Sequence, residues 1–138
     1  MYLSYQTKAG YEKNDLYFIK FLKNHLNIQF FAVSDSGRSG FYTYKERYKN
    51  DKEFLSIDTF WLNSRWEIYY QILKFDIIII SSLHGAENFA KFCKKLNKKV
   101  IVIDSFFNQD YNTDIPADLF IFKGNYALKT YLNLSKKK

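Results

Sequence analysis

The sequence predicts an α/β fold, a Rossmann-like three-layer sandwich around a parallel sheet of about five strands. Two observations favour this class. Apolar runs rich in β-branched residues alternate along the chain with segments whose apolar residues recur at helical spacing. The apolar runs are also continuous, which is typical of parallel strands that helices bury on both faces.

The first part of the chain contributes two expected strands and one helix. Residues 2–5 predict a short first strand. Asn14 or Asp15 can cap the helix that follows, and its apolar side is expected to run as far as Leu26. Residues 28–33 are apolar again and predict the second strand.

The clearest pattern lies in residues 75–105. Four consecutive isoleucines at 77–80 predict a buried strand, and residues 86–96 carry apolar side chains at helical spacing with lysines opposite. Residues 100–103 predict the next strand, which completes a βαβ unit with a right-handed crossover. Cys93 lies on the inner side of the helix and is expected to be a small core residue.

The remaining elements extend the same arrangement. Residues 66–73 predict a helix before the isoleucine strand, residues 119–122 predict a fifth strand, and residues 127–132 predict a final helix. The segments 34–55 and 108–117 are weakly patterned. The expected spatial order is second, first, third, fourth, fifth strand, with a switch point between the first and third. Ligands of such sheets bind beyond the carboxyl ends of the strands near that point.

Composition sets further bounds. A length of 138 residues fits a single domain, 1–138, and a hydrophobic content of 47% is enough for a packed core. One cysteine excludes an internal disulfide. No secretory signal or apolar run of membrane-spanning length is visible, so a cytoplasmic location is expected. The net charge of +7 favours an anionic partner, although an AT-rich genome would also enrich lysine.

Four loops should meet at one rim of the sheet, and the first two contain four candidate ligand-binding residues. Gly10 and Glu12 follow the first strand, and a glycine lets the backbone approach a ligand closely. Asp35 and Arg38 follow the second strand, where the guanidinium could hold a hydroxylated or phosphorylated ligand. The sequence has neither the dinucleotide-binding nor the P-loop glycine motif. The competing interpretations are a plain strand-to-helix turn for the first loop and a flexible surface loop for the second.

The third and fourth loops carry the strongest candidates. Ser82, His84 and Gly85 lie between the isoleucine strand and its helix, where free backbone N–H groups attract anions. A neutral His84 could act as a general base for an attacking hydroxyl. Asp104 follows the next strand and could orient His84 or bind a sugar hydroxyl. The competing interpretations are a capping or packing role for His84 and a turn-closing role for Asp104.

Residues 75–132 resemble the closing half of the N-terminal domain of GT-B glycosyltransferases. Two runs carry the likeness, FDIIIISSLHGAENFAKFCKKLNKKVIVIDSFFN and then ADLFIFKGNYALKTYL. In that family a strand ends in a short ligand-facing loop, and a helix, a VIVID-like strand and an AD-hydrophobic-G-x-Y-A segment follow. The resemblance is one of pattern, and many Rossmann-like domains share part of it.

The resemblance implies an enzyme that transfers sugar from a nucleotide-sugar donor to an acceptor hydroxyl in bacterial surface polysaccharide or glycolipid synthesis. Such enzymes generally need neither an essential metal nor another cofactor. Their N-terminal domain holds the acceptor and often the base, which would be His84, or alternatively Asp35 or Glu12. The residues expected to shape the acceptor cleft are Gly10, Ser82, Gly85 and Asp104.

The donor site of that family lies in a second Rossmann-like half, for which residues 1–138 show no pattern. The nucleotide sugar would therefore reach this chain through a separate or missing C-terminal half, and the chain alone is expected to be inactive. A lipid-linked acceptor would suit a basic, aromatic surface that rests on the anionic inner face of the membrane.

Other functions remain as alternatives. A non-catalytic flavodoxin-like or receiver-like module that binds a ligand or a protein shares the strand pattern. However, Gln6, Thr7 and Lys8 replace the acidic cluster or hydroxyl-rich phosphate loop that such modules need. A nucleotide-sugar epimerase would need a second half as well. Nucleic acid is not favoured, since most aromatic residues fall at core spacing, and the two histidines and one cysteine form no metal motif.

Overall fold

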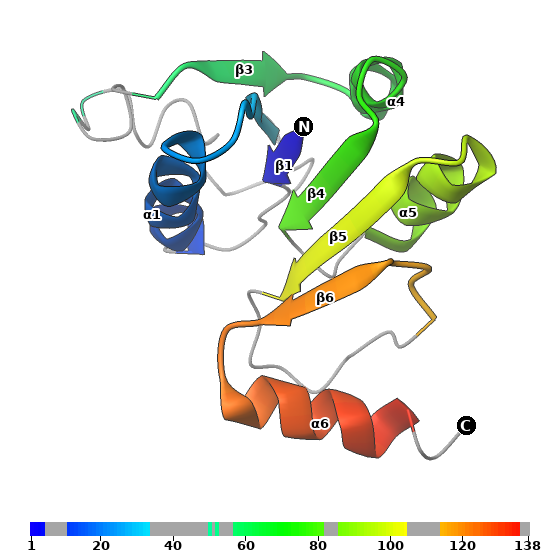
Figure 1. The fold of residues 1–138 in the computed structure, drawn as a ribbon. Coiled ribbons are helices and arrows are strands. Elements are labelled where there is room, and N and C mark those ends of the chain that lie inside the picture. The colour runs from blue at the N-terminus through cyan, green and yellow to red at the C-terminus, as the bar shows by residue number, and fades with distance from the viewer. Residues whose placement is uncertain are drawn as a thin grey trace.

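The computed structural model describes residues 1–4, 11–33, 50, 52, 57–81, 86–104 and 114–135. It contains one parallel six-stranded sheet in the order β3-β2-β1-β4-β5-β6 (Figure 1). The strands are β1 (Tyr2–Ser4), β2 (Phe30–Val33), β3 (Thr59–Leu62), β4 (Ile77–Ser81), β5 (Lys99–Asp104) and β6 (Leu119–Phe122). The predicted α/β sandwich is confirmed, and the five expected strands are neighbours in the predicted order.

The sequence predicts five of these six strands and does not predict β3. Strand β3 pairs in parallel with β2 at the edge of the sheet, and Phe60 stacks on Phe31 with ring centroids 5.1 Å apart. Its sequence, Thr-Phe-Trp-Leu, is short and follows a stretch of mixed charge. An edge position leaves Phe60 48% exposed, so this strand lacks the continuous burial that marks the central ones.

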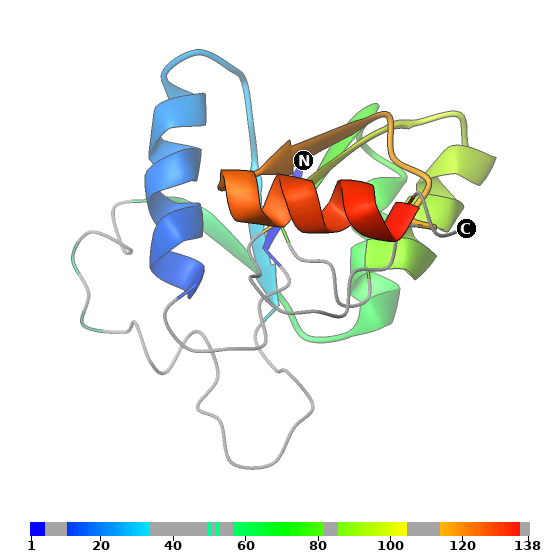
Figure 2. The same ribbon diagram turned by 90° about the horizontal axis from the view of Figure 1, so that it is seen from below.

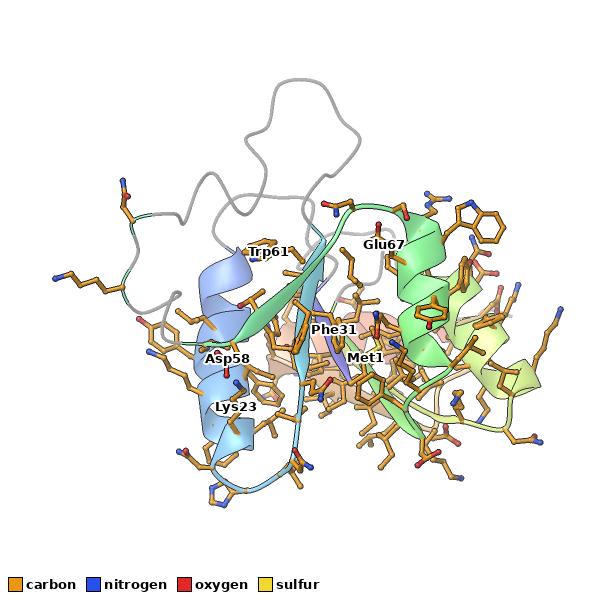
Figure 3. The ribbon with its side chains drawn as sticks, turned by 90° about the horizontal axis from the view of Figure 1, so that it is seen from above. Met1, Lys23, Phe31, Asp58, Trp61 and Glu67 are labelled. Carbon is orange, nitrogen blue, oxygen red and sulfur yellow. The ribbon has the colours of Figure 1, made fainter. Side chains whose placement is uncertain are left out.

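Helices cover both faces of the sheet (Figures 2 and 3). Helix α1 packs on one face, and the other three described helices pack on the opposite face. Right-handed crossovers explain this division, because β1 to β2 and β4 to β5 run in opposite directions across the sheet. The helices are α1 (Tyr11–Lys23), α4 (Arg65–Ile72), α5 (Ala86–Lys95) and α6 (Asn125–Ser135).

The isoleucine strand β4 feeds both halves of the core. Alternate side chains point to opposite faces, so Ile79 packs on the α1 side while Ile78 and Ile80 pack against α4 and α5. This confirms the predicted burial on both faces, except at Ile77, which is 51% exposed. Cys93 on α5 is fully buried as predicted, and burial raises the pKa of its thiol to about 11.

Local hydrogen bonds fix the ends of α4 and α5. Ser64 caps α4 by accepting the Glu67 N–H at 3.2 Å, while the Glu67 carboxylate accepts the Asn63 N–H at 2.9 Å. Helix α5 ends at Lys95, and the turn after it contains Asn97, whose φ of 56° is tolerated better by asparagine than by most residues. The following N–H, of Lys98, closes the turn on a carbonyl of α5.

Helix α1 begins earlier and ends earlier than predicted. It starts at Tyr11, so Asn14 and Asp15 lie inside the helix and neither is its cap. It ends at Lys23, and Leu26, expected on its apolar side, lies beyond it and is 53% exposed. The cap prediction failed because the sequence alone does not distinguish an aspartate that caps a helix from one that lies within the helix with its side chain buried.

Asp118 joins the start of β6 to β5 and α5. Its carboxylate accepts hydrogen bonds from Lys94 Nζ at 2.8 and 2.9 Å and from the Val100 backbone N–H at 2.8 Å. The Lys94 hydrogen bond, followed by that from Val100, lowers the pKa of Asp118 from 3.8 to about 2. The charged form is therefore favoured in the folded state.

We expect Asp118→Asn to remove a pH-dependent part of the stability. Because the folded pKa is depressed, this contribution is present above about pH 4 and is lost as pH falls towards 2. Urea unfolding between pH 7 and pH 2 should show a flatter acid decline in the variant than in the wild type. Asp58→Asn, an exposed carboxylate before β3, is the control, and equal slopes for Asp118→Asn and wild type would contradict the expectation.

Candidate functional site at the switch point

Two serines lie side by side where the sheet reverses its direction of winding. Ser4 ends β1 and Ser81 ends β4, and the two residues are partners in the parallel register. Both are fully buried. The chain leaves β1 towards β2 and leaves β4 towards β5, so the carboxyl ends of these two strands form the switch point of the sheet.

A buried carboxylate connects the two strand ends to α1. Asp15, in the second turn of that helix, is fully buried. Its Oδ2 accepts the Ser4 hydroxyl at 2.5 Å, and its Oδ1 accepts the Ser81 hydroxyl at 2.5 Å and the Tyr2 hydroxyl at 3.1 Å. The helix and both central strands are thereby tied together at one point.

The strand periodicity explains why these donors meet. Tyr2 and Ser4 are two residues apart on β1, so both side chains point towards α1. Their register partners, Ile79 and Ser81, point the same way from β4. A carboxylate removed from water costs several kcal/mol unless the protein replaces its hydration, and three hydroxyl donors do so for Asp15.

Lys123 brings a positive charge to the same carboxylate. It follows β6 directly, and its Nζ lies 3.6 Å from Asp15 Oδ1. The lysine side chain is 25% exposed, whereas Asp15 is not exposed at all, so Lys123 extends from the buried carboxylate towards solvent. Tyr2, Ser4, Asp15, Ser81 and Lys123 are called the Asp15 cluster below.

Tyr2 acts as a neutral donor within the Asp15 cluster. Burial, followed by the negative charge of Asp15, raises the pKa of Tyr2 well above 10. The phenol therefore keeps its proton at neutral pH and donates a hydrogen bond to the Asp15 carboxylate. The cluster consists of one anion, one cation and three neutral hydroxyls. It places polar groups directly below the strand ends, where ligands of such sheets bind.

The structure places the residues predicted from the sequence only in part. Six of them lie outside the described residues: Gly10, Asp35, Arg38, Ser82, His84 and Gly85. Glu12 lies in the first turn of α1 and Asp104 ends β5, and the described part covers their backbone but not their side chains. The strands that precede the predicted loops all end at the switch-point rim, because the sheet is parallel. Convergence of these residues on one crevice stays a prediction.

Sequence reasoning missed the Asp15 cluster, although a signal for it was present. Ser81 follows the isoleucine strand expected beside the switch point, Ser4 lies next to the end of the first strand expected at 2–5, and Asp15 is one of the two cap candidates of the helix that follows. A rule that seeks polar residues at or near the adjacent ends of central strands would have found both serines. Lys123 gave no such signal, since it depends on the reach of a side chain from β6.

A hollow lies at the opposite rim, next to the amino ends of β2 and β3. Its volume is about 450 Å³, and Figure 3 shows two of its lining residues, Lys23 and Asp58. The lining residues are Lys23, Ile28, Gln29, Asp58, Thr59 and Phe60. Open α/β sheets bind their ligands beyond the carboxyl ends of the strands, so the switch-point rim is the stronger candidate.

Comparison with known proteins identifies no relative of this chain. No protein-family profile matches the chain, and no curated protein or solved structure matches it significantly. Within the described ranges, none of the helices has the length and apolar character needed to cross a membrane. The order β3-β2-β1-β4-β5-β6 is that of dinucleotide-binding Rossmann folds, whereas flavodoxin-like sheets have the order 2-1-3-4-5.

We expect Asp15→Ala to lower the free energy of unfolding by about 3–5 kcal/mol, because it removes the carboxylate that accepts from buried hydroxyls and that forms an ion pair with Lys123. Urea unfolding at pH 7 measures the loss. Tyr17→Ala, an exposed change on the same helix, should stay within about 0.5 kcal/mol of wild type.

Ser81→Ala provides a milder version of the same experiment, should Asp15→Ala fail to fold. It removes one donor to Asp15 and should cost about 1–3 kcal/mol. Wild-type stability in both variants would show that the Asp15 cluster does not hold α1 to the sheet.

Proposed function

We propose that this chain is the acceptor-side half of a GT-B glycosyltransferase, with the acceptor bound beyond the carboxyl ends of β1 and β4. The observation that carries the proposal is the Asp15 cluster, in which three buried hydroxyls donate hydrogen bonds to Asp15 at the switch point and Lys123 forms an ion pair with it. A site that positions a hydroxyl needs rigid support, and a buried network of hydrogen bonds at the strand ends supplies it.

The strand order supports this proposal over the flavodoxin-like or receiver-like alternative. Such modules have a five-stranded order in which no strand lies outside the equivalent of β2. Here β3 occupies that position. The two runs that resemble GT-B enzymes also coincide with the continuous unit from β4 through α5 and β5, and with β6 followed by α6.

In the proposed reaction, His84 removes the proton from the acceptor hydroxyl as that oxygen attacks the anomeric carbon of the donor sugar, and the nucleoside diphosphate leaves. Ser82, Gly85 and Asp104 would shape the acceptor site around it. Lys123 would add positive charge beside the strand ends while Asp15 holds it in place. The nucleotide sugar would be bound by a second Rossmann-like half.

The proposal predicts that sugar transfer requires a second half. The purified chain should transfer no radiolabelled sugar from UDP- or GDP-activated donors to a bacterial lipid extract. Addition of a partner encoded beside it, or of the remainder of a longer polypeptide, should restore transfer. Turnover by the chain alone, or failure of every such reconstitution, would contradict the proposed half-site organisation.

The general-base role is tested by His84→Ala in the reconstituted enzyme. We expect kcat to fall by about 10²–10⁴, because positioned proton transfer contributes that much. His25→Ala is the matched control, since His25 lies in the exposed turn after α1 and is the other histidine of the chain. A loss smaller than about tenfold in His84→Ala would remove His84 from the catalytic step.

A further inference from the structure

Helix α4 carries a second apolar stripe that faces away from the core. Ile68 and Ile72 are fully buried against the sheet. Trp66, Tyr70 and Leu73 follow one another at spacings of four and three residues, and they are 82%, 61% and 52% exposed. A surface helix normally presents polar residues on its outer side, so α4 departs from the usual amphipathic pattern.

A groove between α4 and α5 continues this stripe. Its volume is about 480 Å³, and Tyr69 of α4 and Phe92 of α5 meet in it in edge-to-face contact, with 4.8 Å between ring centroids. The rest of the lining includes polar and basic side chains of α5. The lining residues are Trp66, Tyr69, Asn88, Lys91, Phe92 and Lys95.

The surroundings of the stripe are strongly basic. Residues 65–76 and 86–99 together carry seven basic and three acidic side chains, and two of the seven, Lys94 and Lys99, form ion pairs with Asp118 outside these ranges. Lys91 is 55% exposed and forms an ion pair with Glu87 one turn earlier. Lys74 lies over the Tyr70 ring, with its Nζ 4.4 Å from the ring centroid. The exposed aromatic rings are thus framed by cations.

We infer that the outer surface of α4 and α5 binds the anionic surface of a phospholipid membrane. Tryptophan and tyrosine favour the boundary between headgroups and acyl chains, where one side of the ring is apolar and the other is hydrated. Lysine side chains beside them are attracted by anionic headgroups, and each contributes about fivefold in affinity near the surface. The stripe and its basic frame provide both interactions at one place.

The size of the surface favours lipid over a protein partner. Two side chains protrude from an eight-residue helix and a third, Leu73, from its C-cap, whereas a stable protein interface buries at least about 1,000 Å² with close shape complementarity. A membrane needs only a few interfacial anchors together with electrostatic attraction. Because α4 follows the carboxyl end of β3, its Trp66 end lies towards the switch-point rim. The inference does not depend on the proposed sugar transfer.

Sedimentation with vesicles tests the inference directly. The full chain should bind vesicles that contain phosphatidylserine at least tenfold more tightly than vesicles of phosphatidylcholine alone. Lys91→Glu combined with Lys95→Glu, and separately Trp66→Ser, should each weaken binding to the anionic vesicles by at least tenfold. Trp66→Ser changes an exposed position and should fold as the wild type does, which far-UV circular dichroism checks.

Matched variants separate this surface from net charge and general hydrophobicity. Lys20→Glu combined with Lys129→Glu makes the same change in net charge on α1 and α6, and Tyr126→Ser removes an exposed aromatic from α6. Both should bind as the wild type does. Equal losses in the control and test variants, or no binding by the wild type, would overturn the inference.

Tryptophan emission provides an independent measurement, because the chain has two tryptophans. In Trp61→Phe the remaining Trp66 emission should shift to shorter wavelength when anionic vesicles are added. In Trp66→Phe the Trp61 emission should stay unchanged. Concentration-dependent self-association through the α4 stripe in analytical ultracentrifugation, without any shift on vesicles, would assign the surface to a second copy of the chain instead.

Discussion

A carboxylate with no access to water has to obtain its solvation from the protein, and Asp15 obtains it from both central strands at once. Ser4 and Ser81 supply hydroxyls from the ends of β1 and β4, and Tyr2 supplies a third from within β1. These bonds fix the height and rotation of α1 above the sheet. The separation of the central strand ends, where the loops of the predicted site begin, is constrained by the same contacts.

This arrangement couples the packing of α1 to the positions of the central strand ends. The apolar core on each face holds the sheet, but apolar contacts tolerate small sliding movements, whereas short hydrogen bonds to one carboxylate do not. Lys123 extends the constraint to the end of β6, two strands away from β4. A ligand that binds at the switch point would therefore meet strand ends whose relative positions are set before it arrives.

Much of the fold follows from sequence pattern, and the reason is burial. Continuous β-branched runs such as residues 77–80 can be satisfied only between two helical layers, so β4 and β5 were predictable in place and order. The edge strand β3 escaped prediction because one side of it is half exposed. From the sequence, Asp15 was identified only as a possible helix cap. Periodicity predicts which side of a helix is apolar, but it does not predict which donors bind a single buried carboxylate.

The burial of Cys93 has a practical consequence for work on this molecule. The chain has one thiol, it lies inside the core beneath α5, and its raised pKa of about 11 keeps it protonated at neutral pH. A cysteine introduced at an exposed position would thus be the single site open to maleimide chemistry. Two such introduced cysteines, one on each face of the sheet, would let spin labels or fluorophores report a distance across it without replacement of Cys93.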